Sequence, residues 1–161
     1  FEQLVDSAYA CANMFRKQGF TTIVDAGLGL AAHHDDLACY RAVAHNPDFP
    51  VRIIACPMSD IYQPGIAWTD IGDEHLKLGA IKYVIDGSLQ GLTANLSEPY
   101  LAKPETSGKS TVDEQVFRDN LLKTHVAGNQ AFVHANGDKA IDMALDAFEH
   151  ALSVQPRADH R

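Results

Sequence analysis

Four short apolar segments alternate with helical segments along the chain, and this alternation limits the possible folds more than any other feature. The expected strands are 21–26, 51–56, 80–85 and 130–135, each rich in β-branched or other apolar residues. The first three begin about 30 residues apart, which is the natural length of a βαβ unit. Apolar strands separated by helices are typical of a parallel sheet covered by helices. The sequence therefore predicts an α/β fold.

Helical periodicity accounts for the segments before and between the first strands. Apolar residues at helical spacing predict a helix over 2–17, which Gly19 ends, and a second, short helix from Asp36 to His45. The segment from His75 to Leu78 is interpreted as the end of a further helix, stopped by Gly79.

The later helices are predicted from their start signals. Thr111 is followed three residues later by Glu114, a pattern that indicates a capping box at the start of a helix. Asp138 is expected to cap the last helix, whose apolar side includes Ile141 and Leu145. A long loop from Asp86 to about Lys109 separates these helices from the third strand.

Two architectures satisfy this order of elements: an open doubly wound sheet, or part of a (β/α)8 barrel. A complete barrel needs about 250 residues and eight units, whereas this chain has 161 residues. A barrel therefore requires the chain to be one portion of a longer one. The first residue is Phe1 and not Met, which indicates a chain that is processed, trimmed or cut from a longer frame.

Composition excludes several classes of function. The formal net charge is −8 and no Lys/Arg cluster occurs, so a nucleic-acid partner is not expected. No apolar run is long enough for a membrane span, and no secretory segment opens the chain. The three cysteines form no CxxC pair, which favours a reduced, cytoplasmic protein.

Lys82 is the most unusual residue, because it lies inside an apolar strand. Strand alternation places Ala80, Lys82, Val84 and Asp86 on one face. Ile81, Tyr83 and Ile85 lie on the other, which suits packing against helices. Burial would lower the pKa of the lysine and make its amine available for chemistry, including uptake of carbon dioxide to form a carbamate. An edge-strand lysine paired with an aspartate is the alternative, and spacing alone leaves both open.

The carboxyl ends of the strands are the other places where chemistry is expected. His134 ends the fourth strand, just before a glycine turn, and suits a metal ligand or an acid–base group. A histidine hydrogen-bonded within a loop is the alternative. Asp25 and Asp86 end two other strands, and each reads more readily as a turn aspartate than as a ligand. Cys56 ends the remaining strand and is interpreted as a packed thiol.

Three segments together carry a resemblance to a known family. They are Gly19 to Gly27, Ile81 to Leu89 with Leu96 to Tyr100, and Val133 to Asp142. In order and spacing they resemble the amidohydrolase superfamily, in its amidohydrolase-3 or YtcJ-like branch, over essentially the whole of residues 1–161. The resemblance implies the central portion of a (β/α)8 barrel, with the visible strands as barrel strands two to five.

The resemblance also implies a site. Lys82 matches the strand-four lysine, which in many members is carboxylated and bridges two metals, and His134 matches the strand-five histidine ligand. The family's strand-one His-x-His, strand-six histidine and strand-eight aspartate have no counterpart here. In the loop after Ser88, Gln90 and Leu92 stand where Gly and Arg are often found, which weakens inference about the substrate.

The expected function is therefore metal-dependent hydrolysis of a non-peptide carbon–nitrogen bond in a small-molecule substrate, by metal-activated water. One or two divalent metals, with zinc as the expected ion, would be held in the complete protein. The isolated chain is expected to be an inactive fragment that associates with itself or with the missing parts of its parent. The alternatives are a non-catalytic α/β module that binds a small molecule or a partner, and a degenerate homologue.

Overall fold

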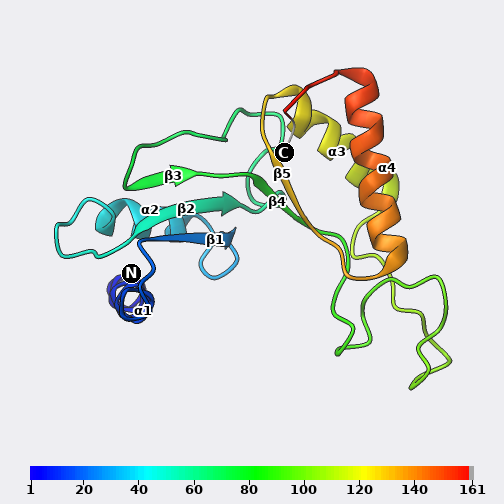
Figure 1. The fold of residues 1–161 in the computed structure, drawn as a ribbon, viewed down its shortest axis with the longest axis horizontal. Coiled ribbons are helices and arrows are strands. Elements are labelled where there is room, and N and C mark those ends of the chain that lie inside the picture. Colours follow the sequence, from blue (N-terminus) through cyan, green and yellow to red (C-terminus); the bar gives the residue numbers. More distant parts are fainter. Residues whose placement is uncertain (160–161) are drawn as a thin grey trace. The chain divides into compact units, whose positions relative to one another are not determined.

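The computed structural model describes residues 1–159 and divides them into two compact units (Figure 1). The first unit comprises Phe1–Gln63 and Trp68–Ile81, and the second comprises Pro64–Ala67 and the chain from Lys82 onward. Both units combine strands with helices, so the predicted α/β class is confirmed. Within the described residues no helix has both the length and the apolar character that a membrane crossing requires.

The first unit contains a three-stranded parallel sheet. Strands β1 (Thr22–Leu28), β2 (Arg52–Pro57) and β3 (Leu76–Leu78) are paired in that order, all parallel. Helices α1 (Glu2–Lys17) and α2 (His34–Val43) pack against each other. The core between sheet and helices contains Ala12, Leu28, Val43, Ile53 and Leu78. The predicted strands near 21–26 and 51–56 and the predicted helix over 2–17 are confirmed.

The interpretation of His75 to Leu78 as a helix end is wrong. Leu76–Leu78 is strand β3, and its residues alternate between buried and half-buried as a strand requires. Ile53 pairs with Leu76 and Ala55 with Leu78, so β3 extends the sheet beyond β2. Gly79 suggested a helix stop, but a run of three residues is too short for local periodicity to reveal a strand.

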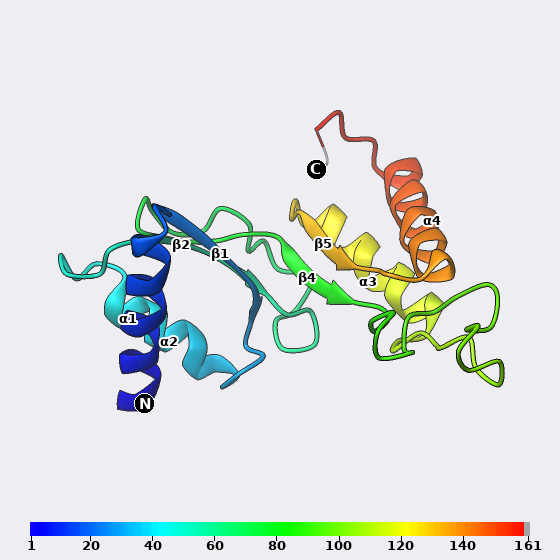
Figure 2. The ribbon, with the colours of Figure 1, turned by 60° about the horizontal axis from the view of Figure 1, so that its bottom comes forward.

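The second unit pairs β4 (Ile81–Val84) with β5 (Ala131–His134). Figure 2 shows the two strands side by side and running in the same direction. Helix α3 (Glu114–Val126) packs against α4 (Asp138–Val154). All four predicted strands are thus present, as members of two sheets of three and two strands in the described chain.

One face of β4 packs against α3, as strand alternation predicted. Ile81, Tyr83 and Ile85 are buried, and the Tyr83 ring lies 5.4 Å from that of Phe117. The Tyr83 hydroxyl lies 3.0 Å from the Asn120 carbonyl oxygen and 2.7 Å from the Thr124 hydroxyl. Burial raises the pKa of Tyr83 to about 12, so the phenol remains a donor. The opposite face of β4 is consequently left for Lys82 and Val84.

Both predicted caps of the later helices are displaced. Asp113, and not Thr111, caps α3, because its carboxylate accepts the N–H of Val116 at 3.1 Å. The Thr111 hydroxyl instead donates to the Val84 carbonyl at 2.8 Å. Asp138 is the first residue of α4 rather than its cap, and its carboxylate accepts the N–H and hydroxyl of Ser97, which hold its pKa below the usual range. The side chains of Thr111 and Asp138 therefore bond to distant residues instead of capping their own helices.

Candidate metal-binding face of the β4–β5 pair

Lys82 and His134 lie on neighbouring strands of one sheet. The Ile85 N–H donates to the His134 carbonyl at 3.2 Å, which joins the ends of β4 and β5. The Lys82 Nζ lies 4.4 Å from the centroid of the Phe132 ring, so Lys82 and Phe132 share a face. His134 is two residues after Phe132 on β5, and strand alternation places it on that face as well. We call this surface, defined by Lys82, Val84, Phe132 and His134, the lysine face.

The lysine face is partly apolar and partly open. Val84 is 41% exposed and Phe132 is 43% exposed, although both belong to strands. The His134 side chain is 37% exposed. Lys82 is half-buried, and its Nζ lies over the Phe132 ring, in the position of a cation–π contact.

The imidazole of His134 is oriented by the turn that follows β4. Its Nε2 lies 3.1 Å from the Gly87 carbonyl oxygen, which can only accept, and 3.1 Å from the Asn136 amide nitrogen, which can only donate. The Asn136 amide also donates to the Gly87 oxygen, at 2.8 Å. When Nε2 carries the proton and donates to Gly87, the lone pair of neutral His134 is on Nδ1. Donation of the other ring N–H to a backbone carbonyl is the usual outer support of a metal-bound histidine.

Asp86 is a buried carboxylate that binds backbone N–H groups of the loops near His134. It is 1% exposed, and its carboxylate accepts the backbone N–H groups of Asn95, Asn136 and Gly137 at 3.0, 2.9 and 2.7 Å. Two loop segments far apart in the sequence, one at Asn95 and one at Asn136 and Gly137, are thus tied to one side chain. Sequence reasoning took Asp86 for a turn residue and missed this role. A carboxylate directly after a buried strand was the available signal, but its partners are non-local.

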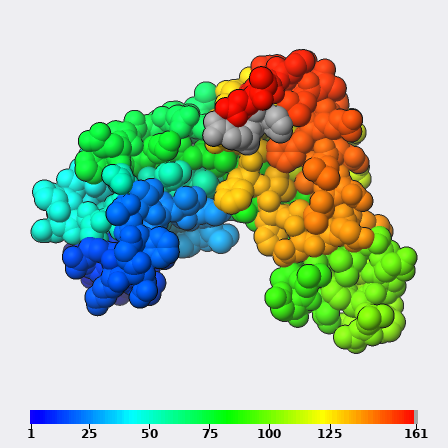
Figure 3. Space-filling view, viewed as in Figure 1, coloured from blue at the N-terminus to red at the C-terminus, as the bar shows by residue number. Residues whose placement is uncertain are grey.

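The long segment between β4 and α3 is held close to α4 by this arrangement. In Figure 3 the light-green atoms of this segment lie at the surface next to the orange atoms of α4. The backbone of Asn95 approaches Gly137 so closely that a Cβ on Gly137 would overlap it. Only glycine fits at this contact, and the Gly137 N–H then reaches Asp86.

Gly137→Ala is expected to destabilise the protein by about 1–3 kcal/mol or more, because backbone atoms have to move to admit the methyl group. Gly65→Ala is the matched control, since a Cβ at Gly65 meets nothing within 4 Å, and its effect should stay within about 0.5 kcal/mol. Guanidinium unfolding of the two variants measures both effects. Equal stabilities for the two variants would contradict the described contact between Asn95 and Gly137.

The other strand ends have structural roles. Asp25 lies within β1 and not in a turn after it, so its interpretation as a turn aspartate is wrong. Its carboxylate accepts the Gly27 N–H at 2.9 Å and the Tyr40 hydroxyl at 2.9 Å. Cys56 is 3% exposed, as expected for a packed thiol, and Cys39 is buried too. Cys11 is exposed, so packing does not account for all three thiols.

The described residues contain no complete set of metal ligands. Among residues 1–159 no group of three or more His, Cys, Asp or Glu side chains is placed to hold a metal ion. A protein zinc site generally has three or four protein ligands. Lys82 and His134 share a face and are suitable as two members of such a set, provided that Lys82 is carboxylated.

The chain combines parallel strands and helices, with a lysine inside β4 and a histidine at the end of the neighbouring β5. This is the arrangement that the resemblance to the amidohydrolases implied. A sequence model of the amidohydrolase family matches residues 1–161, and the chain belongs to this family. The putative amidohydrolase YtcJ of Bacillus subtilis is 37% identical over 116 residues, covering 70% of this chain and 21% of YtcJ. The protein LONG AFTER FAR-RED 3 of Arabidopsis thaliana is 28% identical over 156 residues, covering 89% of this chain and 26% of that protein.

Solved structures show the same fold. An uncharacterized metal-dependent hydrolase of Pyrococcus horikoshii superposes with a TM-score of 0.75 at 23% identity, covering 92% of this chain and 30% of that one. A second uncharacterized metal-dependent hydrolase, from Pyrococcus furiosus, gives a TM-score of 0.63 at 27% identity over 81% of this chain and 27% of its own. The chain thus spans between 21% and 26% of the length of the curated relatives.

Proposed function

We propose that a longer protein containing this chain is a metal-dependent hydrolase that cleaves a non-peptide carbon–nitrogen bond in a small molecule. The observation that carries the proposal is the placement of Lys82 and His134 on one face of neighbouring strands. Family membership supports the hydrolase class, and two similar structures are described as metal-dependent hydrolases. In this proposal β1, β2, β4 and β5, the four strands predicted from the sequence, are strands two to five of a (β/α)8 barrel.

Lys82 would serve as a carboxylated ligand. Its neutral amine attacks carbon dioxide, a C–N bond forms, and one proton leaves, which gives an anionic carbamate whose oxygens can bind divalent metals. The ammonium must first lose its proton and leave the Phe132 ring, over which it now lies. Carboxylation of Lys82 is therefore expected to require a metal that holds the product.

His134 would bind through Nδ1, in the tautomer whose Nε2–H donates to the Gly87 carbonyl. A bound zinc ion would supply a Lewis acid and an activated water. The chain's own contribution is to hold the imidazole in one orientation, through Gly87 and Asn136. Further ligands have to come from outside the described residues.

Carboxylation of Lys82 can be tested directly in the longer protein. Zinc reconstitution with 13C-labelled bicarbonate should give a carbamate signal in the 13C NMR spectrum, and zinc uptake should fall when carbon dioxide is removed. The signal should be absent from Lys82→Ala and retained in Lys77→Ala, which changes a lysine whose Nζ lies 3.1 Å from Asp70 in the first unit. Full zinc uptake without carbon dioxide, and no carbamate signal, would overturn the assignment of Lys82.

The proposal extends to the surroundings of the chain. Val84 and Phe132 expose apolar surface on the lysine face, and exposed apolar patches favour association. We propose that this face is covered by further chain of the parent or by a second copy, and that the isolated chain is inactive. No disulfide links Cys11, Cys39 and Cys56 in the described structure, which suits a cytoplasmic location.

A further inference from the structure

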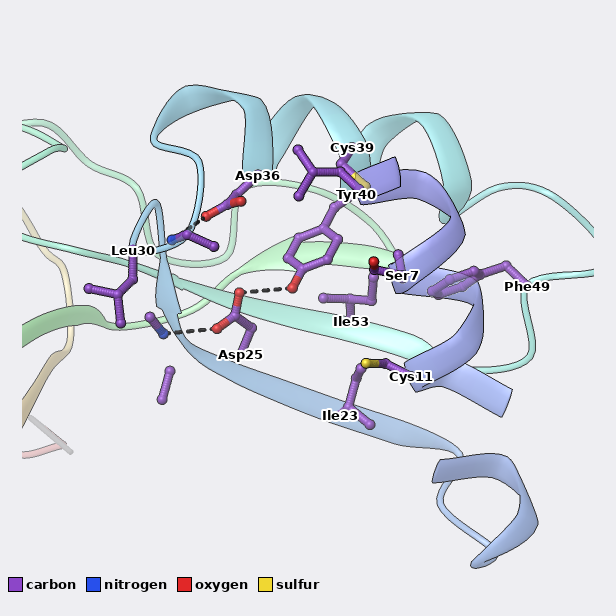
Figure 4. A pocket seen from close by; sticks show the side chains of 15 residues that line it. Ser7, Cys11, Ile23, Asp25, Leu30, Asp36, Cys39, Tyr40, Phe49 and Ile53 are labelled. Carbon is purple, nitrogen blue, oxygen red and sulfur yellow. Dashed lines mark hydrogen bonds between the residues drawn. The ribbon is translucent and has the colours of Figure 1, made fainter. Parts of the chain in front are cut away.

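The first unit contains a cavity of about 740 Å³ that the proposed hydrolysis does not use. It lies between α1, β1 and α2, on the helix-covered side of the sheet, as the close-up in Figure 4 shows. Its volume is within the range of small-molecule sites, about 300–1,000 Å³. Apolar side chains make up most of its lining, among them Leu4, Ala8, Ile23, Leu30, Phe49 and Ile53. This lining suits the hydrocarbon part of a ligand.

A hydrogen-bonded pair of polar side chains lies inside the cavity. The Tyr40 hydroxyl donates to Asp25 Oδ2 at 2.9 Å, and the Gly27 N–H donates to Asp25 Oδ1 at 2.9 Å. Figure 4 shows the Asp25 carboxylate beside the Tyr40 hydroxyl, with a dashed line to each of its two hydrogen-bond donors. Each carboxylate oxygen can accept more than one hydrogen bond. Asp25 therefore retains capacity to accept a hydrogen bond from a ligand.

Tyr40 orients the Asp25 carboxylate through this hydrogen bond. Burial and the charge of Asp25 raise the pKa of the Tyr40 phenol above its ordinary value, so the phenol stays protonated and donates.

The charged side chains that line the cavity are all acidic. Asp25 and Asp36 are among the fifteen lining residues, and none of those fifteen, all in the described part of the chain, is Lys, Arg or His. Asp36 is buried, and its Oδ2 accepts the N–H groups of Gly29 and Ala31 at 3.0 and 3.2 Å. Asp25 is half-buried, and it is the more accessible of the two carboxylates.

We propose that this cavity binds a small organic amine: a protonated ammonium group on an apolar body. The ammonium would donate to the Asp25 carboxylate, and the body would lie against Ile23, Phe49 and Ile53. A neutral molecule of the same shape gains the apolar contacts without the charge-assisted hydrogen bond. An anionic one is repelled by both aspartates. The site is separate from the lysine face, since all its lining residues belong to the first unit.

Cys11 provides a direct readout of occupancy, because it lines the cavity and is exposed, whereas Cys39 and Cys56 are buried. The rate of Cys11 alkylation by iodoacetamide is measured by mass spectrometry in the presence of three probes that differ only at one end: 4-phenylbutylamine, 4-phenylbutanol and 4-phenylbutyrate. The amine should half-protect Cys11 at a concentration about tenfold lower than the alcohol, the ratio that 1.4 kcal/mol provides. The carboxylate probe should protect least.

Two substitutions assign the preference to Asp25. In Asp25→Asn the amine and the alcohol should protect equally, while Asp35→Asn, an exposed aspartate of α2 outside the lining, should retain the tenfold ratio. Tyr40→Phe keeps the carboxylate and should also retain the ratio, so a folding defect in Asp25→Asn does not remove the test. Equal protection by the three probes in the unaltered chain, or a preference for the amine that survives Asp25→Asn, would overturn the proposal. So would a longer protein in which Cys11 resists alkylation without any probe, because polypeptide would then fill the cavity.

Discussion

His134→Ala in a longer, metal-loaded protein is expected to lower both bound zinc and hydrolysis by at least about 100-fold, since loss of mere outer partners of metal ligands already costs 10–100-fold. Lys82→Ala should have an effect of the same size, because the carbamate cannot form without the amine. Asn136→Ala should cost less, about tenfold, since Asn136 contacts the same Gly87 oxygen as His134 and is not itself proposed as a ligand.

Zinc content by mass spectrometry and the rate of hydrolysis measure the two effects separately. Lys123→Ala serves as the control, because Lys123 is an exposed lysine on α3. His134 and Lys82 are not fully buried, so thermal unfolding of the metal-free variants should change little. A His134→Ala protein that keeps its zinc and its activity would contradict the assignment.

Asp86→Ala is expected to destabilise the second unit by about 3–5 kcal/mol, on the order of 1–2 kcal/mol for each N–H left without its acceptor. The N–H groups concerned are those of Asn95, Asn136 and Gly137. Because Asp86 is 1% exposed, water does not readily replace the carboxylate. The loss should appear in denaturant unfolding, and the three amides should exchange faster with deuterium than in the unaltered chain.

Asp142→Ala is the matched control for Asp86→Ala, because Asp142 is an exposed aspartate of α4; its effect should stay within about 0.5 kcal/mol. Asp86→Asn should be intermediate, since the amide keeps one accepting oxygen. A loss below about 1 kcal/mol in Asp86→Ala, the value of a single ordinary hydrogen bond, would show that the three contacts do not hold the loops.

Local periodicity predicted the elements whose stabilising contacts repeat along the chain. Helix α1 was predicted with its observed ends, Glu2 and Lys17, because its apolar side recurs at helical spacing. The same reasoning failed for β3, which consists of three residues and exists through its pairing with β2. It also failed for Thr111 and Asp138, whose side chains bond to Val84 and Ser97 rather than to their own helices.

In the candidate site, too, local patterns predicted some features, whereas others depend on contacts between distant residues. Strand alternation correctly separated the buried Ile81, Tyr83 and Ile85 from the face of Lys82. The role of Asp86 required knowledge of two loop segments that meet it from up to 51 positions away. The contact between His134 and Gly87 likewise joins residues that are 47 positions apart. Such contacts are products of the fold and leave no local pattern in the sequence.

The ligand roles of Lys82 and His134 remain predictions that rest on family resemblance and on their shared face. Two donors, one of which needs carboxylation, fall short of the three or four that zinc generally requires. A carbamate is itself held by its metals, so in the isolated chain Lys82 should remain an amine over Phe132.

Zinc content and amide hydrolysis, measured side by side on the 161-residue chain and on a longer protein that contains it, test the central claim most directly. The isolated chain should bind zinc weakly and hydrolyse no amide substrate. The longer protein should hold zinc and turn over substrate, and Lys82→Ala or His134→Ala should abolish both. Stoichiometric, tightly held zinc with turnover in the isolated chain would contradict the account, because its ligands would then have to be other residues of this sequence.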